Sequence, residues 1–141
     1  MDEKEILLKL YQNVDMGIVG IDAIYNQIET KELKKKIKSQ RKEYIILKRK
    51  LSKLCKHYKV TDKELRPFVK LNSELMVGMK TIFDKSDSKI AKLMMEGTNK
   101  GLIQLQELLN HYNKKDKKLV KILEETLELE HQNNNELKKF L

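Results

Sequence analysis

Apolar residues recur at helical spacing along most of the chain, and they do so in four long blocks. In residues 4–28 two series of positions each recur every seven residues. The first series is Leu7, Val14, Ile21 and Ile28, and the second, beside it on the helix, is Leu10, Gly17 and Ile24. In residues 31–58 the apolar positions alternate three and four apart, and residues 87–112 and 116–140 repeat this pattern. Such spacing places an apolar stripe on one face of a helix, so each block is a predicted helix.

The lengths of the connections predict how these helices are arranged. Only a few residues separate the first block from the second, and the third from the fourth. Helices joined this closely pack as antiparallel neighbours, which gives two hairpins. The longer connection between the hairpins contains a further predicted helix over residues 67–83. Two hairpins joined by a long crossover form the ferritin-like arrangement, so we expect an all-α, ferritin-like four-helix bundle with one domain, residues 1–141.

Polar residues that can cap helices stand where the blocks begin. The candidates are Thr30, Ser86 or Ser88, and Asn113 or Asp116. Such a side chain accepts a hydrogen bond from a free backbone N–H group of the first helical turn. Thr61-Asp62-Lys63-Glu64 has the spacing of a capping box, in which the threonine and the glutamate each bond the other's backbone N–H group.

The composition excludes several classes of protein. The 141 residues include 5 Gly and 1 Pro, too few for the frequent turns of an all-β sandwich or barrel. A single cysteine, Cys55, excludes an intrachain disulfide and a cysteine-based zinc site. No apolar run approaches the ~18 residues of a membrane span, and the acidic start, Met1-Asp2-Glu3, does not resemble a secretory signal. We therefore expect a cytoplasmic location.

The formal net charge of +9 is concentrated in one part of the sequence. Residues 31–60 carry 13 Lys and Arg against two acids, whereas residues 1–30 carry six acids against two lysines. An acidic helix beside a basic one favours their pairing, although exposed ion pairs contribute little each. Only three of the 30 basic residues are Arg, the side chain that nucleic-acid recognition favours, so nucleic-acid binding is not expected.

Three glycines fall on the predicted buried stripes, although glycine in a helix costs up to about 1 kcal/mol relative to alanine. They are Gly17 in the first block and Gly97 and Gly101 in the third. One interpretation is close packing, in which the missing side chain lets helices approach or leaves room for a large neighbour such as Tyr44. The other is space for a ligand or an ion in the middle of the bundle.

Polar residues interrupt or border the apolar stripes near the middle of each long helix. They are Asp15, Gln40, Glu43, Glu96, Glu130 and Asn133. Buried polar groups of this kind usually hydrogen-bond one another and specify how the helices pair. The alternative is a carboxylate site for Fe, Mn or Zn, formed by Asp15, Glu43, Glu96, Glu130 and His131.

The sites of ferritin-like di-metal proteins provide a template for that alternative. They take one Glu from each of two helices and a Glu-x-x-His pair from each of the other two. The corresponding pairs here lack histidine: Gln40-x-x-Glu43 and Glu130-x-x-Asn133. Glu128-x-x-His131 has the right composition, but His131 is rotated away from the apolar stripe. We therefore expect no bound metal and no cofactor.

Three segments carry a resemblance to a known family. They are Tyr11-Gln-Asn-Val-Asp-Met-Gly17, the stretch from Asp84 through Gly97 to Gly101, and the C-terminal Glu130-His-Gln-Asn-Asn-Asn-Glu-Leu-Lys-Lys-Phe-Leu141. In these segments the chain resembles small bacterial ferritin-like four-helix proteins of clostridia and related anaerobes, a family with no established reaction. The resemblance covers nearly the whole chain, and it implies the fold rather than an activity.

These observations lead to two functional hypotheses. The sequence has no phosphate-binding loop, serine elbow or dinucleotide fingerprint, and no activating partner can be placed beside Cys55. We therefore expect a non-catalytic protein with a binding or structural role that forms a homo-oligomer, most simply a dimer. The alternative is a ferritin-like carboxylate protein that binds metal in the middle of the bundle.

Overall fold

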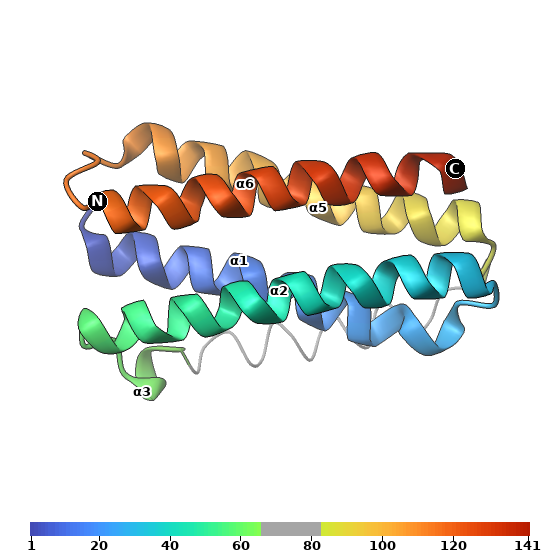
Figure 1. The fold of residues 1–141 in the computed structure, drawn as a ribbon, viewed down its shortest axis with the longest axis horizontal. Coiled ribbons are helices and arrows are strands. Elements are labelled where there is room, and N and C mark those ends of the chain that lie inside the picture. The colour runs from blue at the N-terminus through green and yellow to red at the C-terminus, as the bar shows by residue number, and fades with distance from the viewer. Residues whose placement is uncertain (66–82) are drawn as a thin grey trace.

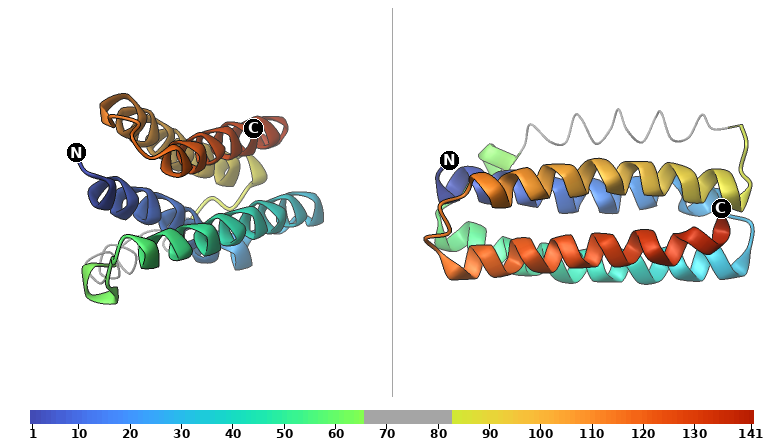
Figure 2. Two further views of the ribbon diagram at one scale, coloured as in Figure 1. Left: turned by 60° about the vertical axis from the view of Figure 1, so that its left-hand side comes forward. Right: turned by 90° about the horizontal axis from the view of Figure 1, so that it is seen from above.

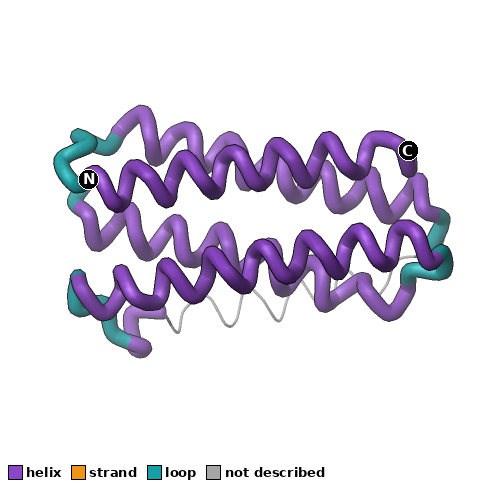
Figure 3. Tube along the Cα trace, viewed as in Figure 1, coloured by secondary structure: helices purple, strands orange, loops and turns teal. Residues whose placement is uncertain are grey.

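The computed structural model describes residues 1–65 and 83–141, and in them the chain forms helices and the turns between them. The four long helices are α1 (Glu3–Ile24), α2 (Lys31–His57), α5 (Asp87–His111) and α6 (Lys117–Leu137) (Figure 1). The shorter elements are α3 (Asp62–Leu65) and two turns of 3-10 helix, Tyr25–Gln27 and Lys138–Phe140. Figure 3 shows helices and loops, and no strand, in this described part of the chain. The prediction of an all-α bundle is confirmed.

The predicted long helices begin within one residue of those observed. The helix predicted over residues 67–83 lies outside the described residues, except for its last position. The described connections agree with the predicted hairpins, because short turns join α1 to α2 and α5 to α6.

The four long helices lie side by side, each antiparallel to both of its neighbours (Figure 1, Figure 2). α1 packs against α2, α2 against α6, α6 against α5, and α5 against α1. α2 ends at the end of the bundle where α1 begins, whereas α5 begins at the opposite end (Figure 1). α5 therefore runs in the same direction as α2, diagonally across the bundle from it.

Side chains cap most of the helix starts, and one predicted cap is wrong. Ser86 accepts from the Lys89 N–H group at 3.2 Å and Asp116 accepts from that of Lys118 at 2.9 Å, as the sequence indicated. Thr61 and Glu64 form the predicted capping box, with reciprocal bonds of 2.8 and 3.3 Å. Thr30 precedes α2 but makes no side-chain cap bond. Its hydroxyl donates instead to Asp87 at 2.7 Å, which joins the start of α2 to the start of α5.

The apolar stripes of the long helices form the core. Leu7, Leu10, Val14 and Ile21 of α1 are completely buried. The other helices contribute Leu33, Ile37 and Leu51 from α2, Ile90 and Leu105 from α5, and Leu119 and Leu123 from α6. Burial of each such side chain contributes about 1.5–3 kcal/mol, so these stripes supply most of the driving force for folding. Among the helices described, none combines the length and the apolar character of a membrane span.

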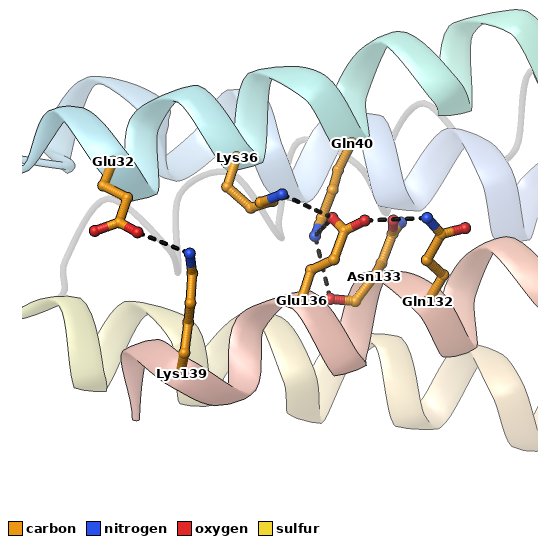
Figure 4. Close-up of polar contacts among 7 residues, drawn as sticks. All are labelled: Glu32, Lys36, Gln40, Gln132, Asn133, Glu136 and Lys139. Carbon is orange, nitrogen blue, oxygen red and sulfur yellow. Dashed lines mark hydrogen bonds and ion pairs between the residues drawn. The ribbon is translucent and has the colours of Figure 1, made fainter.

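The basic helix α2 lies between acidic side chains of α1 and α6. Its ion pairs are Arg41–Asp22 (2.6 Å) and Lys48–Asp15 (2.6 Å) with α1, and Lys50–Glu125 (3.2 Å) and Lys36–Glu136 (3.7 Å) with α6. Figure 4 shows the Lys36–Glu136 pair and, beyond the end of α6, the pair of Lys139 with Glu32. Exposed pairs contribute roughly 0–1 kcal/mol each, so they guide which helices become neighbours more than they stabilise the fold.

α1 and α2 approach closely at Gly17. A Cβ atom on this residue would lie 2.8 Å from Cζ and 2.9 Å from Cε1 of the Tyr44 ring. Tyr44 is buried in the core, with 3% of its surface exposed. At Gly20 on the same helix a Cβ atom would have no neighbour within 4 Å in residues 1–65 and 83–141, so these residues impose no such constraint.

Alanine substitutions at these two glycines should therefore have different effects. Gly20→Ala should raise the free energy of unfolding by up to about 1 kcal/mol, because alanine has the better helix propensity. Gly17→Ala gains the same propensity but displaces the Tyr44 ring, and overpacking of this kind costs about 1–3 kcal/mol. Urea denaturation should give the lower unfolding free energy for Gly17→Ala, and equal values would show that the ring shifts without cost.

Candidate functional site

A pocket of about 510 Å³ lies between α1 and α5 near the middle of the bundle. Side chains and glycines from all four long helices line the pocket. The lining residues of α1 run from Gln12 to Gly20, and those of α5 run from Leu93 to Gln104. α2 contributes Gln40 and Tyr44, and α6 contributes Glu130. Met16, Leu93 and Met94 supply apolar walls. Four glycines, Gly17, Gly20, Gly97 and Gly101, reduce the side-chain volume around the pocket.

Glu130 of α6 forms the floor of this pocket and is 2% exposed. Its Oε1 accepts a hydrogen bond of 3.4 Å from the Tyr44 hydroxyl. Its Oε2 is buried and has no hydrogen-bond partner among the described residues. This oxygen lies 3.1 Å from the position that a Cβ atom would take on Gly101. The absence of a side chain at Gly101 therefore makes room for the carboxyl group.

Burial dominates the electrostatics of the pocket floor. Desolvation raises the pKa of the Glu130 carboxyl to about 8, and the hydrogen bond from Tyr44 acts in the opposite direction. The pKa of the Tyr44 hydroxyl is also raised, first by burial and then by the charge that Glu130 can carry. At neutral pH most Glu130 side chains are therefore protonated, and the group is a neutral hydrogen-bond donor and acceptor.

Asn13 of α1 joins the polar floor, and the sequence analysis did not identify it. Its Nδ2 donates to the Gly101 carbonyl at 3.1 Å and to Gln104 Oε1 at 3.0 Å, which links α1 to α5. Its Oδ1 is buried without a partner among the described residues. The signal for this position was present, because Asn13 stands seven residues after the buried Ile6 and so shares its side of the helix.

A second polar contact joins α2 to α6 (Figure 4). Gln40 donates to the Asn133 carbonyl at 3.1 Å and to Glu136 Oε2 at 3.4 Å. Gln40 and Asn133 are both buried, and a smaller cavity of about 180 Å³ lies beside them. Asn134 donates to Asn99 at 2.6 Å and so joins α6 to α5. The structure thus places Gln40, Glu130 and Asn133 in the polar interior.

Three residues predicted for the interior or for a metal site lie on the surface instead. Glu43, Glu96 and His131 are all exposed. Glu43 and His131 directly neighbour the buried Tyr44 and Glu130, and one residue turns an α-helix by about 100°. The sequence pattern located the correct turn of each helix but assigned these side chains to the wrong face.

Two further assignments need correction. Asp15 is not part of the polar interior, because it lies at the edge between α1 and α2 and pairs with Lys48 at 2.6 Å. Gly97 is not a close-packing position within the described part of the chain, because a Cβ atom there would meet none of its atoms within 4 Å. Gly97 is exposed and lines the pocket, so its missing side chain leaves open space rather than permitting a helix contact.

The carboxylate residues proposed for a metal site do not converge. Of that set, only Glu130 is buried, and Asp15 is engaged by a lysine on another edge of the bundle. Within residues 1–65 and 83–141 there is no group of three His, Cys, Asp or Glu side chains that could hold a metal ion. The geometry supports hydrogen bonding at the pocket floor rather than metal coordination.

Cys55 has the environment of a structural residue. It is buried in the core near the end of α2, and burial raises the pKa of its thiol to about 11. A thiol with a raised pKa carries little thiolate at neutral pH, so it is a poor nucleophile.

Comparisons of the chain with protein-family models, with curated proteins and with solved structures found no match. The geometry of the pocket is therefore the basis for proposing a function.

The buried carboxyl group predicts how stability depends on pH. The folded protein keeps the Glu130 proton up to about pH 8, whereas an unfolded chain loses it near the ordinary value of 4.5. The contribution of this group to stability should therefore fall as the pH rises between these values, by at most about 1.4 kcal/mol per unit. Glu130→Gln, which keeps the shape without the ionisation, should remove this dependence.

Urea denaturation of the wild type and of Glu130→Gln at pH 5, 6, 7 and 8 measures this effect. The difference in unfolding free energy between the two proteins should shift in favour of the variant as the pH rises. A constant difference across the series would show that Glu130 does not ionise with a raised pKa.

The metal hypothesis gives a separate prediction. Mn(II) or Fe(II) added after treatment with chelator should leave the melting temperature unchanged, because the proposed ligands do not meet. A metal at 100 times its dissociation constant would instead add about 2.7 kcal/mol to the unfolding free energy. Thermal melts with and without metal test this, and a stabilisation that Glu130→Ala abolishes would restore the metal site.

Proposed function

We propose that this chain is a non-catalytic binding protein that holds a small organic molecule in the pocket between α1 and α5. The observation that carries the proposal is a buried acid, Glu130, with an unsatisfied oxygen at the floor of an open pocket. Pockets that bind small molecules measure roughly 300–1,000 Å³ and combine apolar walls with a few polar groups. This pocket, at about 510 Å³, has both properties.

The glycines support a pocket that is kept open. Each helical glycine costs up to about 1 kcal/mol relative to alanine, so its presence needs a structural reason. Tyr44 provides that reason at Gly17, and Glu130 provides it at Gly101. At Gly20 and Gly97 a Cβ atom would have no neighbour within 4 Å among the described residues, so no packing contact of these residues requires a glycine there. Both line the pocket, and side chains there would reduce its volume.

The lining favours binding over catalysis. Its described residues include no His, Cys or Ser, and the Thr98 hydroxyl is engaged by the Met94 carbonyl at 2.9 Å. Nucleophilic catalysis needs a nucleophile and a base within hydrogen-bond reach of each other. The groups on the pocket floor can instead orient a ligand by hydrogen bonds.

We also propose that the bundle is ferritin-like in its wiring. Supporting this, α1 and α2 form one hairpin, α5 and α6 form another, and α5 starts at the opposite end of the bundle from the end of α2 (Figure 1). Such a path corresponds to a four-helix bundle with one long crossover. The homo-oligomer and the cytoplasmic location expected from the sequence stay predictions.

A fluorescent probe tests the proposed pocket. N-phenyl-1-naphthylamine, an uncharged aromatic dye that brightens in apolar surroundings, should bind the wild-type protein in equimolar amount. Gly97→Phe adds a ring at a position with open space, so the variant should fold while its dye binding falls at least tenfold.

Ile103→Phe is the matched control, since it adds the same ring on the same helix at a site that is 62% exposed and outside the pocket lining. This control should bind the dye as the wild type does, and circular dichroism should show equal helix content in all three proteins. Unchanged dye binding in Gly97→Phe would contradict the proposed function.

A further inference from the structure

The pocket floor presents a carboxyl group that forms no ion pair within residues 1–65 and 83–141. Glu130 receives one long hydrogen bond from Tyr44, and its Oε2 has no partner among the described residues. Buried carboxyl groups are normally paired or fully hydrogen-bonded, because isolating one from water is costly. The unsatisfied oxygen therefore marks the point at which a ligand can contribute the most binding energy.

Carboxyl groups outnumber basic side chains around the pocket. Those that line it with Glu130 are Tyr44 from α2, and Glu96 and Lys100 from α5. The α1 part of the lining carries no charged side chain. Two carboxyl groups thus accompany one lysine in a protein whose net charge is +9. The aromatic ring of Tyr44 adds a surface of the kind that attracts organic cations.

From this geometry we infer that the pocket binds a small organic amine, with its ammonium group against Glu130 and its apolar part between α1 and α5. The inference rests on the proposed function and names the class of its ligand. An ammonium group donates charge-assisted hydrogen bonds to a carboxylate, which are stronger than those between neutral groups. An anionic ligand would oppose the ionisation of Glu130, and a neutral ligand would leave Glu130 as an uncharged acid, so neither would gain a charge-assisted hydrogen bond.

Binding of an amine is coupled to the loss of a proton. In the empty pocket at pH 6 Glu130 is a neutral acid, since burial raises its pKa to about 8. The bound ammonium ion stabilises the carboxylate, so one proton leaves Glu130 for solvent with each ligand bound. The dissociation constant should therefore fall about tenfold per pH unit between pH 6 and pH 8 and then level off.

Three probes with one apolar body and different head groups test the inference. They are 4-phenylbutylamine, 4-phenylbutan-1-ol and 4-phenylbutanoate, which are cationic, neutral and anionic at pH 8. Isothermal titration calorimetry at pH 6, 7 and 8 should give the amine at least tenfold tighter binding than the alcohol at pH 8. Titrations at pH 6 in two buffers of different ionisation enthalpy should show the release of about one proton per amine bound.

Glu130→Gln is the informative variant, because the amide keeps the shape but cannot become a carboxylate. It should lose both the preference for the amine over the alcohol and the pH dependence of amine binding. The buffer comparison on the wild type tests the same coupling without any variant.

The possible failures separate the two proposals. Equal or tighter binding of the alcohol or the acid by the wild type, or an amine that binds without proton release, overturns the amine inference and leaves the pocket as a binding site. If none of the three probes binds while the fluorescent dye does, the amine inference also fails. If neither the probes nor the dye binds, the proposed function fails with it.

Discussion

All four long helices meet around the contact of Tyr44 with Glu130. The tyrosine projects from α2 over Gly17 of α1, where a Cβ atom would lie 2.8 Å from its ring. Its hydroxyl reaches Glu130 of α6 at 3.4 Å, and the glutamate in turn packs over Gly101 of α5. Two large polar side chains therefore occupy the centre of the bundle because two glycines on the facing helices make room for them.

This arrangement also explains why the interior contains an open space. Tyr44 and Glu130 fill the volume over Gly17 and Gly101, but no described residue fills the corresponding volume at Gly20 and Gly97. The apolar stripes on either side already supply a closed core, so a pocket can exist here without loss of the fold. The buried acid lies at the level of this pocket, which connects the architecture to the proposed binding role.

Much of the fold was predictable because helix periodicity is a local property. The heptads of α1 and the stripes of α2, α5 and α6 identify which residues enter the core, and short connections require antiparallel neighbours. The candidate site was predictable in part, since Gly17, Gly101, Gln40, Glu130 and Asn133 all interrupt these stripes. Errors arose at their flanks, where Glu43 and His131 adjoin buried residues but face solvent. A shift of one position along a helix rotates a side chain by about 100°, which is enough to move it from the core to the solvent. Periodicity alone does not locate the edge of the buried face to within one residue.

The amino-acid sequence by itself determined the helices, their pairing into two hairpins and three of the polar residues of the interior, Gln40, Glu130 and Asn133. These follow from spacing, since a residue's place on a helix depends only on its neighbours along the chain. Only the tertiary structure decided that Gly17 and Gly101 are packed while Gly20 and Gly97 are open, and that Thr30 bonds Asp87 instead of capping α2. It also decided that Asp15 pairs with Lys48, while Oε2 of Glu130 has no hydrogen-bond partner among the described residues. Each of these facts depends on which residues of other helices come within a few ångströms, and that distance is set by how four helices pack together at once.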